Sequence, residues 1–116
     1  MHFKLIIALV EEIEADAVMK AVRHAGVMGV TEIPSARGEG LEHLQTFFGL
    51  NLESRMEVLL FLVEEHMSRS VLEQIKQIGN IDATPGTGVA FQLNVEDAVG
   101  VTHQIQKLNE LVGEQI

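Results

Sequence analysis

The sequence contains no cysteine among its 116 residues. This absence excludes disulfides, thiolate metal ligands and a cysteine nucleophile, and it gives secretion no support. Positive charge is also scarce, because 8 Lys and Arg stand against 17 Asp and Glu, for a formal net charge of -9. Such a surface repels a phosphate backbone over most of its area, which argues against nucleic acid as a partner.

Long apolar runs are missing as well. The first apolar stretch begins at Phe3 and is ended by Glu11, far short of a membrane span, and no cleavage site follows it. We therefore expect a cytoplasmic protein that is not itself a membrane protein. Hydrophobic residues make up 47% of the chain, enough to bury one core but hardly two. The expectation is a single domain over residues 1–116.

Hydrophobic spacing predicts four strands, at 3–10, 27–33, 56–63 and from the glycine turn at 86–88 to residue 95. A first helix is expected to begin among the acidic residues at 11–16 and to stop at Gly26. Its predicted apolar stripe is Ile13, Ala17, Ala21 and Ala25. A second helix is expected over 67–78, where Ser70 and Glu73 have capping-box spacing and Gly79 supplies a stop.

The resulting order is βαββαβ, followed by an amphipathic C-terminal helix over about 101–112. This order predicts a ferredoxin-like α+β fold, in which a four-stranded antiparallel sheet carries both helices on one face. The other face would be apolar, and its simplest cover is another copy of the same sheet. A closed homo-oligomer is therefore expected.

Two connections stand out between these elements. Residues 35–54 have no sustained period, and a loop of that length in a compact domain is usually functional or disordered. The turn Gly86-Thr87-Gly88 leaves backbone N–H groups bare at the start of a strand. A small anion or another subunit could approach them closely, although the turn could also be merely a strand-leading turn.

Taken together, the residues resemble the PII signal-transduction proteins (nitrogen regulatory protein P-II type) and their PII-like relatives over roughly 3–101. The resemblance rests on KLIIA at 4–8, VTEI at 30–33, SARGEG at 35–40, GTGVAF at 86–91 and NVEDA at 94–98. It implies a homotrimer with a T-loop at about 35–54 and a B-loop at about 84–89. It also implies a small effector in clefts between subunits, with the ligand-binding residues Ala36, Arg37, Gly38, Gly86, Thr87, Gly88 and Val89.

Two departures from the family pattern concern the ligand. Val89 stands where PII proteins typically have a phosphate-binding lysine, and Val99-Gly100-Val101 lacks the arginines of their C-loop. Moving a triphosphate from water into a neutral cleft costs a large free energy of desolvation. The cofactor is thus unknown: an adenine nucleotide is one candidate, while a smaller or less charged ligand, or none, is favoured. The chain also has no tyrosine, which excludes uridylylation of the T-loop tyrosine that some members modify.

As the resemblance implies, the T-loop would control a membrane transporter or a metabolic enzyme. The regulated pathway could be one of nitrogen, carbon or metal. The candidate partner-binding residues of the T-loop are Leu41, His43, Phe47 and Phe48. Exposed aromatic anchors suit a partner's groove. The alternative is that the two phenylalanines fold back onto their own subunit.

Histidine chemistry supports the second hypothesis, a metal-responsive trimer resembling the divalent-cation tolerance proteins. The weak metal candidates are His43, His66 and Glu64, because no histidine pair has the spacing that fixes two ligands on one element. A catalytic acid–base pair of His66 with Glu64 or Glu65 is the third hypothesis. Strand alternation would send the two glutamates to opposite faces, and no nucleophile motif is present, so we expect no enzyme.

Overall fold

The computed structural model describes residues 2–27, 29–34, 56–83 and 88–101. Its elements are β1 (Phe3–Glu11), α1 (Glu12–His24), β2 (Val30–Pro34), β3 (Met56–Glu64), α2 (Glu65–Ile78) and β4 (Gly88–Val95). The predicted βαββαβ order is confirmed. The T-loop, most of the B-loop and the expected C-terminal helix lie outside the described residues. No helix in the described ranges is long and apolar enough to cross a membrane.

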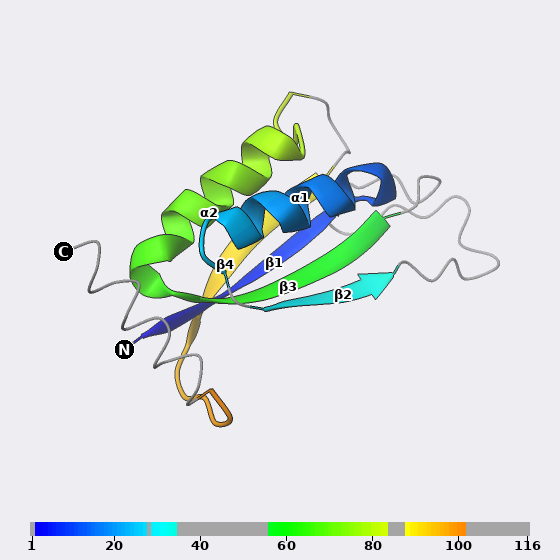
Figure 1. Ribbon diagram of the computed structural model, residues 1–116. Coiled ribbons are helices and arrows are strands. Elements are labelled where there is room, and N and C mark those ends of the chain that lie inside the picture. The colour runs from blue at the N-terminus through cyan, green and yellow to red at the C-terminus, as the bar shows by residue number, and fades with distance from the viewer. Residues whose placement is uncertain (1, 28, 35–55, 84–87, 102–116) are drawn as a thin grey trace.

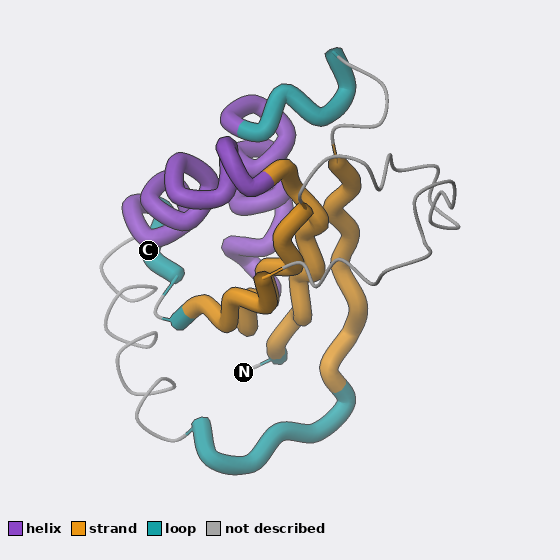
Figure 2. The backbone as a smooth tube through the Cα atoms, turned by 90° about the vertical axis from the view of Figure 1, so that its right-hand side faces the viewer, coloured by secondary structure: helices purple, strands orange, loops and turns teal. Residues whose placement is uncertain are grey.

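The four strands form one antiparallel sheet in the order β2-β3-β1-β4. Both helices lie on the same face of this sheet, which gives the molecule two layers (Figures 1 and 2). The predicted ferredoxin-like arrangement is therefore confirmed. β1 is central, and its residue Phe3 pairs with Glu64 of β3 on one side and with Val95 of β4 on the other.

The core lies between the helices and the sheet. Successive side chains of a strand point to opposite faces, so alternate residues of β1 and β3 reach the helices. Those residues are buried, as are the helix side chains that meet them. The strands contribute Ile6, Ala8, Val10, Leu59, Phe61 and Val63, and the helices contribute Ala15, Val18, Met19, Val22, Val71 and Ile75.

The predicted apolar stripe of α1 is wrong. Ile13 is 82% exposed, and the buried stripe consists of Ala15, Val18, Met19 and Val22. Their spacing is also helical, but the direction of the stripe differs by about a third of a turn. The reason is area: Val18, Met19 and Val22 remove more apolar surface from water than the three alanines of the predicted stripe would.

Alanine substitution on the two sides of α1 tests this orientation. Val18→Ala should lower the free energy of unfolding by about 2 kcal/mol, because two buried methyl groups are lost and a cavity remains. The matched control Ile13→Ala should change it by less than about 0.5 kcal/mol, since Ile13 is exposed. Urea denaturation of both variants measures the difference, and an equal loss would contradict the orientation.

The predicted start of α2 is also wrong. The helix begins at Glu65, and Glu64 is its N-cap, so the Ser70 and Glu73 pair lies inside the helix rather than at its start. There Glu73 instead binds Arg69, at 2.6 Å between Oε1 and Nη2. The ends of the two helices are closer to expectation. α1 ends at His24, just before Gly26 with φ 101°, and α2 ends at Ile78 with Gly79 as its C-cap. The second strand starts at Val30, three residues later than predicted.

The face of the sheet that the helices leave uncovered is apolar, as the sequence predicted. The strand registers place thirteen large apolar residues there, most of them half-buried and Ile33 and Leu93 exposed. They are Phe3, Leu5, Ile7, Leu9, Ile33, Met56, Val58, Leu60, Leu62, Val89, Phe91, Leu93 and Val95. A homo-oligomer that covers this face stays a prediction.

Candidate functional site

Among the seven predicted ligand-binding residues, only Gly88 and Val89 lie within the described residues. Both begin β4, where Gly88 pairs with Val10 and Val89 pairs with Leu9. The other five, Ala36, Arg37, Gly38, Gly86 and Thr87, fall outside them, as do the candidate partner contacts Leu41, His43, Phe47 and Phe48. Their grouping into one site therefore stays a prediction.

Gly88 is required by packing. A Cβ atom at this position would lie 2.6 Å from the backbone oxygen of Leu9 and 3.2 Å from Cγ1 of Ile81. The first contact is with backbone, which cannot move aside without disturbing the β1–β4 pairing. A side chain here would thus strain the fold whether or not a ligand binds nearby.

The strand registers define where the two predicted loops leave the sheet. Pro34 pairs with Glu57, Glu57 pairs with Val10, and Val10 pairs with Gly88. These four residues form one row across the sheet, at the same end of all four strands. Pro34 is the last residue before the T-loop region, and Gly88 lies near the end of the B-loop region at about 84–89, so both loops leave from this end, on opposite edges (Figure 1).

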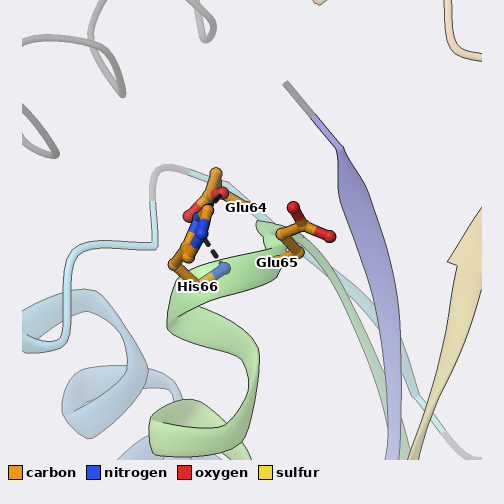
Figure 3. A group of neighbouring side chains, drawn as sticks. All are labelled: Glu64, Glu65 and His66. Atoms are coloured by element: carbon orange, nitrogen blue, oxygen red, sulfur yellow. Dashed lines mark hydrogen bonds and ion pairs between the residues drawn. The ribbon is translucent and has the colours of Figure 1, made fainter.

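The weak metal candidates Glu64 and His66 do come together, at the start of α2 (Figure 3). The Glu64 side chain is 3% exposed, and its Oε1 lies 2.5 Å from Nδ1 of His66 while its Oε2 accepts the backbone N–H of His66 at 2.9 Å. The hydrogen bond and charge of Glu64 raise the pKa of His66 above its usual value. Glu64 therefore caps the helix and pairs with its first-turn histidine.

Glu65 lies apart from that pair in Figure 3, yet one ligand atom from each of the three side chains falls within 4.8 Å of the others. The expectation that strand alternation separates Glu64 from Glu65 is wrong, because Glu65 already belongs to α2. Carboxylate and imidazole groups at this spacing could hold a metal ion. Both oxygens of Glu64 are already used within the group, however, and a capping role accounts for them.

Removing the Glu64 carboxylate should destabilise α2. Glu64→Ala is expected to lower the free energy of unfolding by about 1 kcal/mol, because the N-terminal N–H groups lose their cap. The pKa of His66 should fall toward its ordinary value in this variant, as its partner is gone. NMR titration of the His66 ring measures the second effect, and an unchanged pKa would rule out the Glu64–His66 pair.

Sequence reasoning missed a buried carboxylate in β3. Glu57 is 9% exposed, on the face that the helices cover, and its Oε2 has no hydrogen-bond partner in the described part of the chain. A hydrogen bond to Glu32, burial, and the negative charges of Glu32, Glu12 and Asp16 raise the pKa of Glu57 from 4.5 to about 7. The available signal was a lone acidic residue inside an otherwise apolar strand.

A shallow cavity of about 220 Å³ lies between α2 and the start of β4, over Leu72, Ile81 and Ala90. The cationic side chains of Arg69 and Lys76 line it, and each has an acidic neighbour. Arg69 pairs with Glu73 at 2.6 Å, and Nζ of Lys76 lies 3.5 Å from Oδ2 of Asp82. The cavity thus offers an anion no net positive charge, and it does not replace the missing phosphate-binding lysine.

Comparisons with solved structures agree with the fold. CPII from Thiomonas intermedia K12, a nitrogen regulatory PII-like protein in its apo form, is 17% identical with a TM-score of 0.62, over 82% of this chain and 90% of that one. CPII bound to ADP, AMP and acetate is 18% identical with a TM-score of 0.58, over 83% and 90%. A putative PII-like signaling protein from Thermus thermophilus is 22% identical with a TM-score of 0.59, over 82% and 87%.

Sequence comparison decides the family. No curated protein matches the chain significantly. The family profile of nitrogen regulatory protein P-II, in contrast, matches residues 3–104, which is most of the chain and includes all six described strands and helices. The chain therefore belongs to the nitrogen regulatory protein P-II family.

Proposed function

We propose that this chain is a PII-like signal-transduction protein that senses a small effector in clefts between the subunits of a homotrimer. Occupancy of the cleft changes the conformation of the T-loop at 35–54, and the T-loop controls a transporter or a metabolic enzyme in the cytoplasm. The protein itself does not catalyse a reaction. The metal-responsive alternative is not favoured, because the family match is to P-II proteins.

The observation that carries this proposal is the row of paired residues from Pro34 to Gly88. Three strand spacings separate the ends of that row, or roughly 14 Å. Within one subunit the T-loop base and the B-loop therefore leave from opposite edges of the sheet. When subunits associate edge to edge, β2 of one subunit can approach β4 of the next. Arg37 then belongs to one side of a cleft and Gly88 to the other.

The uncovered apolar face supports assembly. The large apolar side chains on this sheet face form a patch of the kind that marks an interaction surface. Closed symmetry lets identical sheets cover one another. A trimer is the assembly that the family suggests, and light scattering after size-exclusion chromatography tests it against the mass of three subunits.

Val89 limits how much negative charge the effector can carry. With valine in place of the family lysine and the Arg69 and Lys76 side chains paired elsewhere, few described cations are available for phosphates. One CPII structure carries ADP, AMP and acetate. We therefore propose a ligand with less charge than ATP, such as AMP, ADP or a small carboxylate. Coupling to the T-loop follows if the ligand binds one loop arrangement more tightly than the other.

Calorimetric titration with AMP, ADP, ATP, acetate and bicarbonate tests whether the cleft binds an effector. The Val89→Lys variant tests whether position 89 contacts its phosphates. The added ammonium should raise the affinity for ATP about tenfold or more and make it salt-dependent, because it supplies a charge-assisted partner for phosphate. Val89→Gln is the matched control, with similar length and no charge. Equal ATP binding by both variants would place the nucleotide site elsewhere or exclude it.

The partner side of the proposal needs a separate experiment. Deleting residues 41–50 removes Leu41, His43, Phe47 and Phe48 together but leaves the described sheet and helices intact. Effector binding should survive the deletion, whereas recovery of a transporter or enzyme partner by affinity capture should be lost. Capture that persists without these residues would contradict control through the T-loop.

A further inference from the structure

The start of α2 gathers one imidazole and two carboxylates. Ligand atoms of Glu64, Glu65 and His66 all lie within 4.8 Å of one another, and no other three histidine or acidic side chains do so in the described part of the chain. Consecutive residues rarely meet in this way. They do so here because Glu64 is the N-cap, with the extended angles φ -70° and ψ 143°. Its side chain turns back over the first turn of the helix (Figure 3).

Backbone hydrogen bonds hold two of these three residues in place. Oε2 of Glu64 accepts the backbone N–H of His66 at 2.9 Å. The backbone N–H of Glu65 donates to the backbone oxygen of His2, also at 2.9 Å, and this bond fastens Glu65 to the residue before β1. The imidazole of His66, in contrast, is 74% exposed. A metal ion arriving from solution therefore meets one fixed carboxylate and two side chains that can adjust to it.

The buried carboxylate of Glu64 needs a positive partner. Its side chain is 3% exposed, and no lysine or arginine of the described ranges forms an ion pair with it. Its neighbour is Nδ1 of His66, 2.5 Å from Oε1, and an imidazole offsets the charge only while it is protonated. A metal ion between Oε1 and Nδ1 supplies positive charge to a neutral imidazole. The cap bond is kept, because it uses Oε2.

Two features of the helix start oppose a metal ion, and neither is decisive. The N-terminus of a helix carries roughly half a positive charge, whereas Glu64 and Glu65 together carry two negative charges. Ligand atoms on one zinc ion lie about 3.3 Å apart, at bond lengths of roughly 2.0–2.2 Å. Oε1 and Nδ1 must therefore separate slightly, and the Glu65 carboxylate must swing inward. Both movable side chains reach solvent, so their rotation does not disturb the core.

We propose that Glu64, Glu65 and His66 form a binding site for a transition-metal ion of the Zn²⁺ class, with water in the fourth position. An imidazole ligand suits Zn²⁺, Cu²⁺ or Ni²⁺ better than Ca²⁺ or Mg²⁺. Three protein ligands and an open fourth position are a common zinc arrangement. The bound ion would fasten the last residue of β3 to the first turn of α2.

This site is separate from the proposed effector cleft. Glu57 lies in the row from which the two loops leave, and Glu64 is seven residues further along β3, roughly 23 Å away. None of the three metal ligands is a predicted ligand-binding residue of the cleft. The inference keeps the P-II family assignment and does not rest on the identity of the effector.

The test is calorimetric titration of the full chain with Zn²⁺, Ca²⁺ and Mg²⁺. We expect saturable binding of one Zn²⁺ per subunit with a dissociation constant on the order of 10 μM, weaker than a four-ligand structural site. His66→Ala should weaken this binding at least tenfold, and its exposed side chain makes no contribution to the core. The matched control is His24→Ala, which removes an exposed histidine from α1 and should change the affinity less than twofold.

Glu65→Gln provides a second variant, because it removes one ligand charge and leaves the Glu64 cap in place. It should weaken Zn²⁺ binding severalfold or more. NMR spectra recorded during the titration should show the ring signals of His66 shifting at lower Zn²⁺ concentrations than those of His24.

Three results would overturn the proposal. The first is the absence of saturable Zn²⁺ binding up to 1 mM, about a hundred times the expected constant. The second is equal affinity in wild type and His66→Ala, which would place the ion on other histidines. The third is binding of Ca²⁺ or Mg²⁺ as tight as that of Zn²⁺, which would contradict an imidazole ligand.

Discussion

Gly88→Ala should lower the free energy of unfolding by about 3 kcal/mol, a large effect for a single added methyl group. The new Cβ would lie 2.6 Å from the Leu9 backbone oxygen, and the strand pairing holds that oxygen in place. Relief requires β4 to move away from β1 at the row that ends in Gly88. Urea denaturation and amide hydrogen exchange of β4 measure the loss.

Gly100→Ala is the matched control. Gly100 has φ +82°, which L residues rarely adopt, but a Cβ there would meet nothing within 4 Å. Its substitution should cost about 1 kcal/mol of backbone strain without any clash. A loss at Gly88 no larger than that at Gly100 would contradict the steric argument. Because Gly88 serves the fold, substitutions at Val89 are better probes of ligand binding.

Glu57→Gln should make the protein less sensitive to pH. In the wild type the pKa of Glu57 is raised from 4.5 to about 7, so the folded state holds a proton that the unfolded chain releases. The stability from this proton is complete below about pH 4.5, falls as pH rises, and is gone above about pH 7. The fall amounts to up to about 3 kcal/mol for a shift of this size.

Glutamine keeps a neutral side chain at every pH. The variant should therefore be more stable than the wild type at pH 8 by up to about 3 kcal/mol, and similar to it near pH 4.5. Chemical denaturation from pH 4.5 to pH 8 measures both proteins. Glu14→Gln should follow the wild-type profile. Parallel profiles for wild type and Glu57→Gln would show that Glu57 titrates normally.

The fold could be predicted largely from apolar spacing. The runs at 3–10 and 56–63 became β1 and β3, each with one added glutamate, because their length and apolarity suit strands covered on both sides. The two helices followed from period and glycine stops. Their order limited the topology to few choices, and the short motifs at 86–91 and 94–98 pointed to the P-II family.

Errors arose where burial decided between similar patterns. Both stripes of α1 have helical spacing. Which of them is buried depends on the face that packs on the sheet, and this is a property of the tertiary structure. The start of α2 was misplaced because Glu64 is a rarer cap than serine. The surroundings of Glu57 were out of reach for a related reason. Glu32 and Glu57 are 25 positions apart, and only the β2–β3 register places them two residues apart on one face of the ladder.

The central place of β1 has a consequence for how the chain reaches this structure. Phe3 pairs with Glu64 and Val95, so both neighbours of the first strand are contributed from 61 and 92 positions further along. Contacts of such long sequence separation slow folding, because loop-closure entropy must be lost before pairing compensates for it. During synthesis the apolar strand must wait for most of the chain to emerge. Until then the unpaired edges of β1 are prone to aggregation, so we expect chaperones to bind this segment.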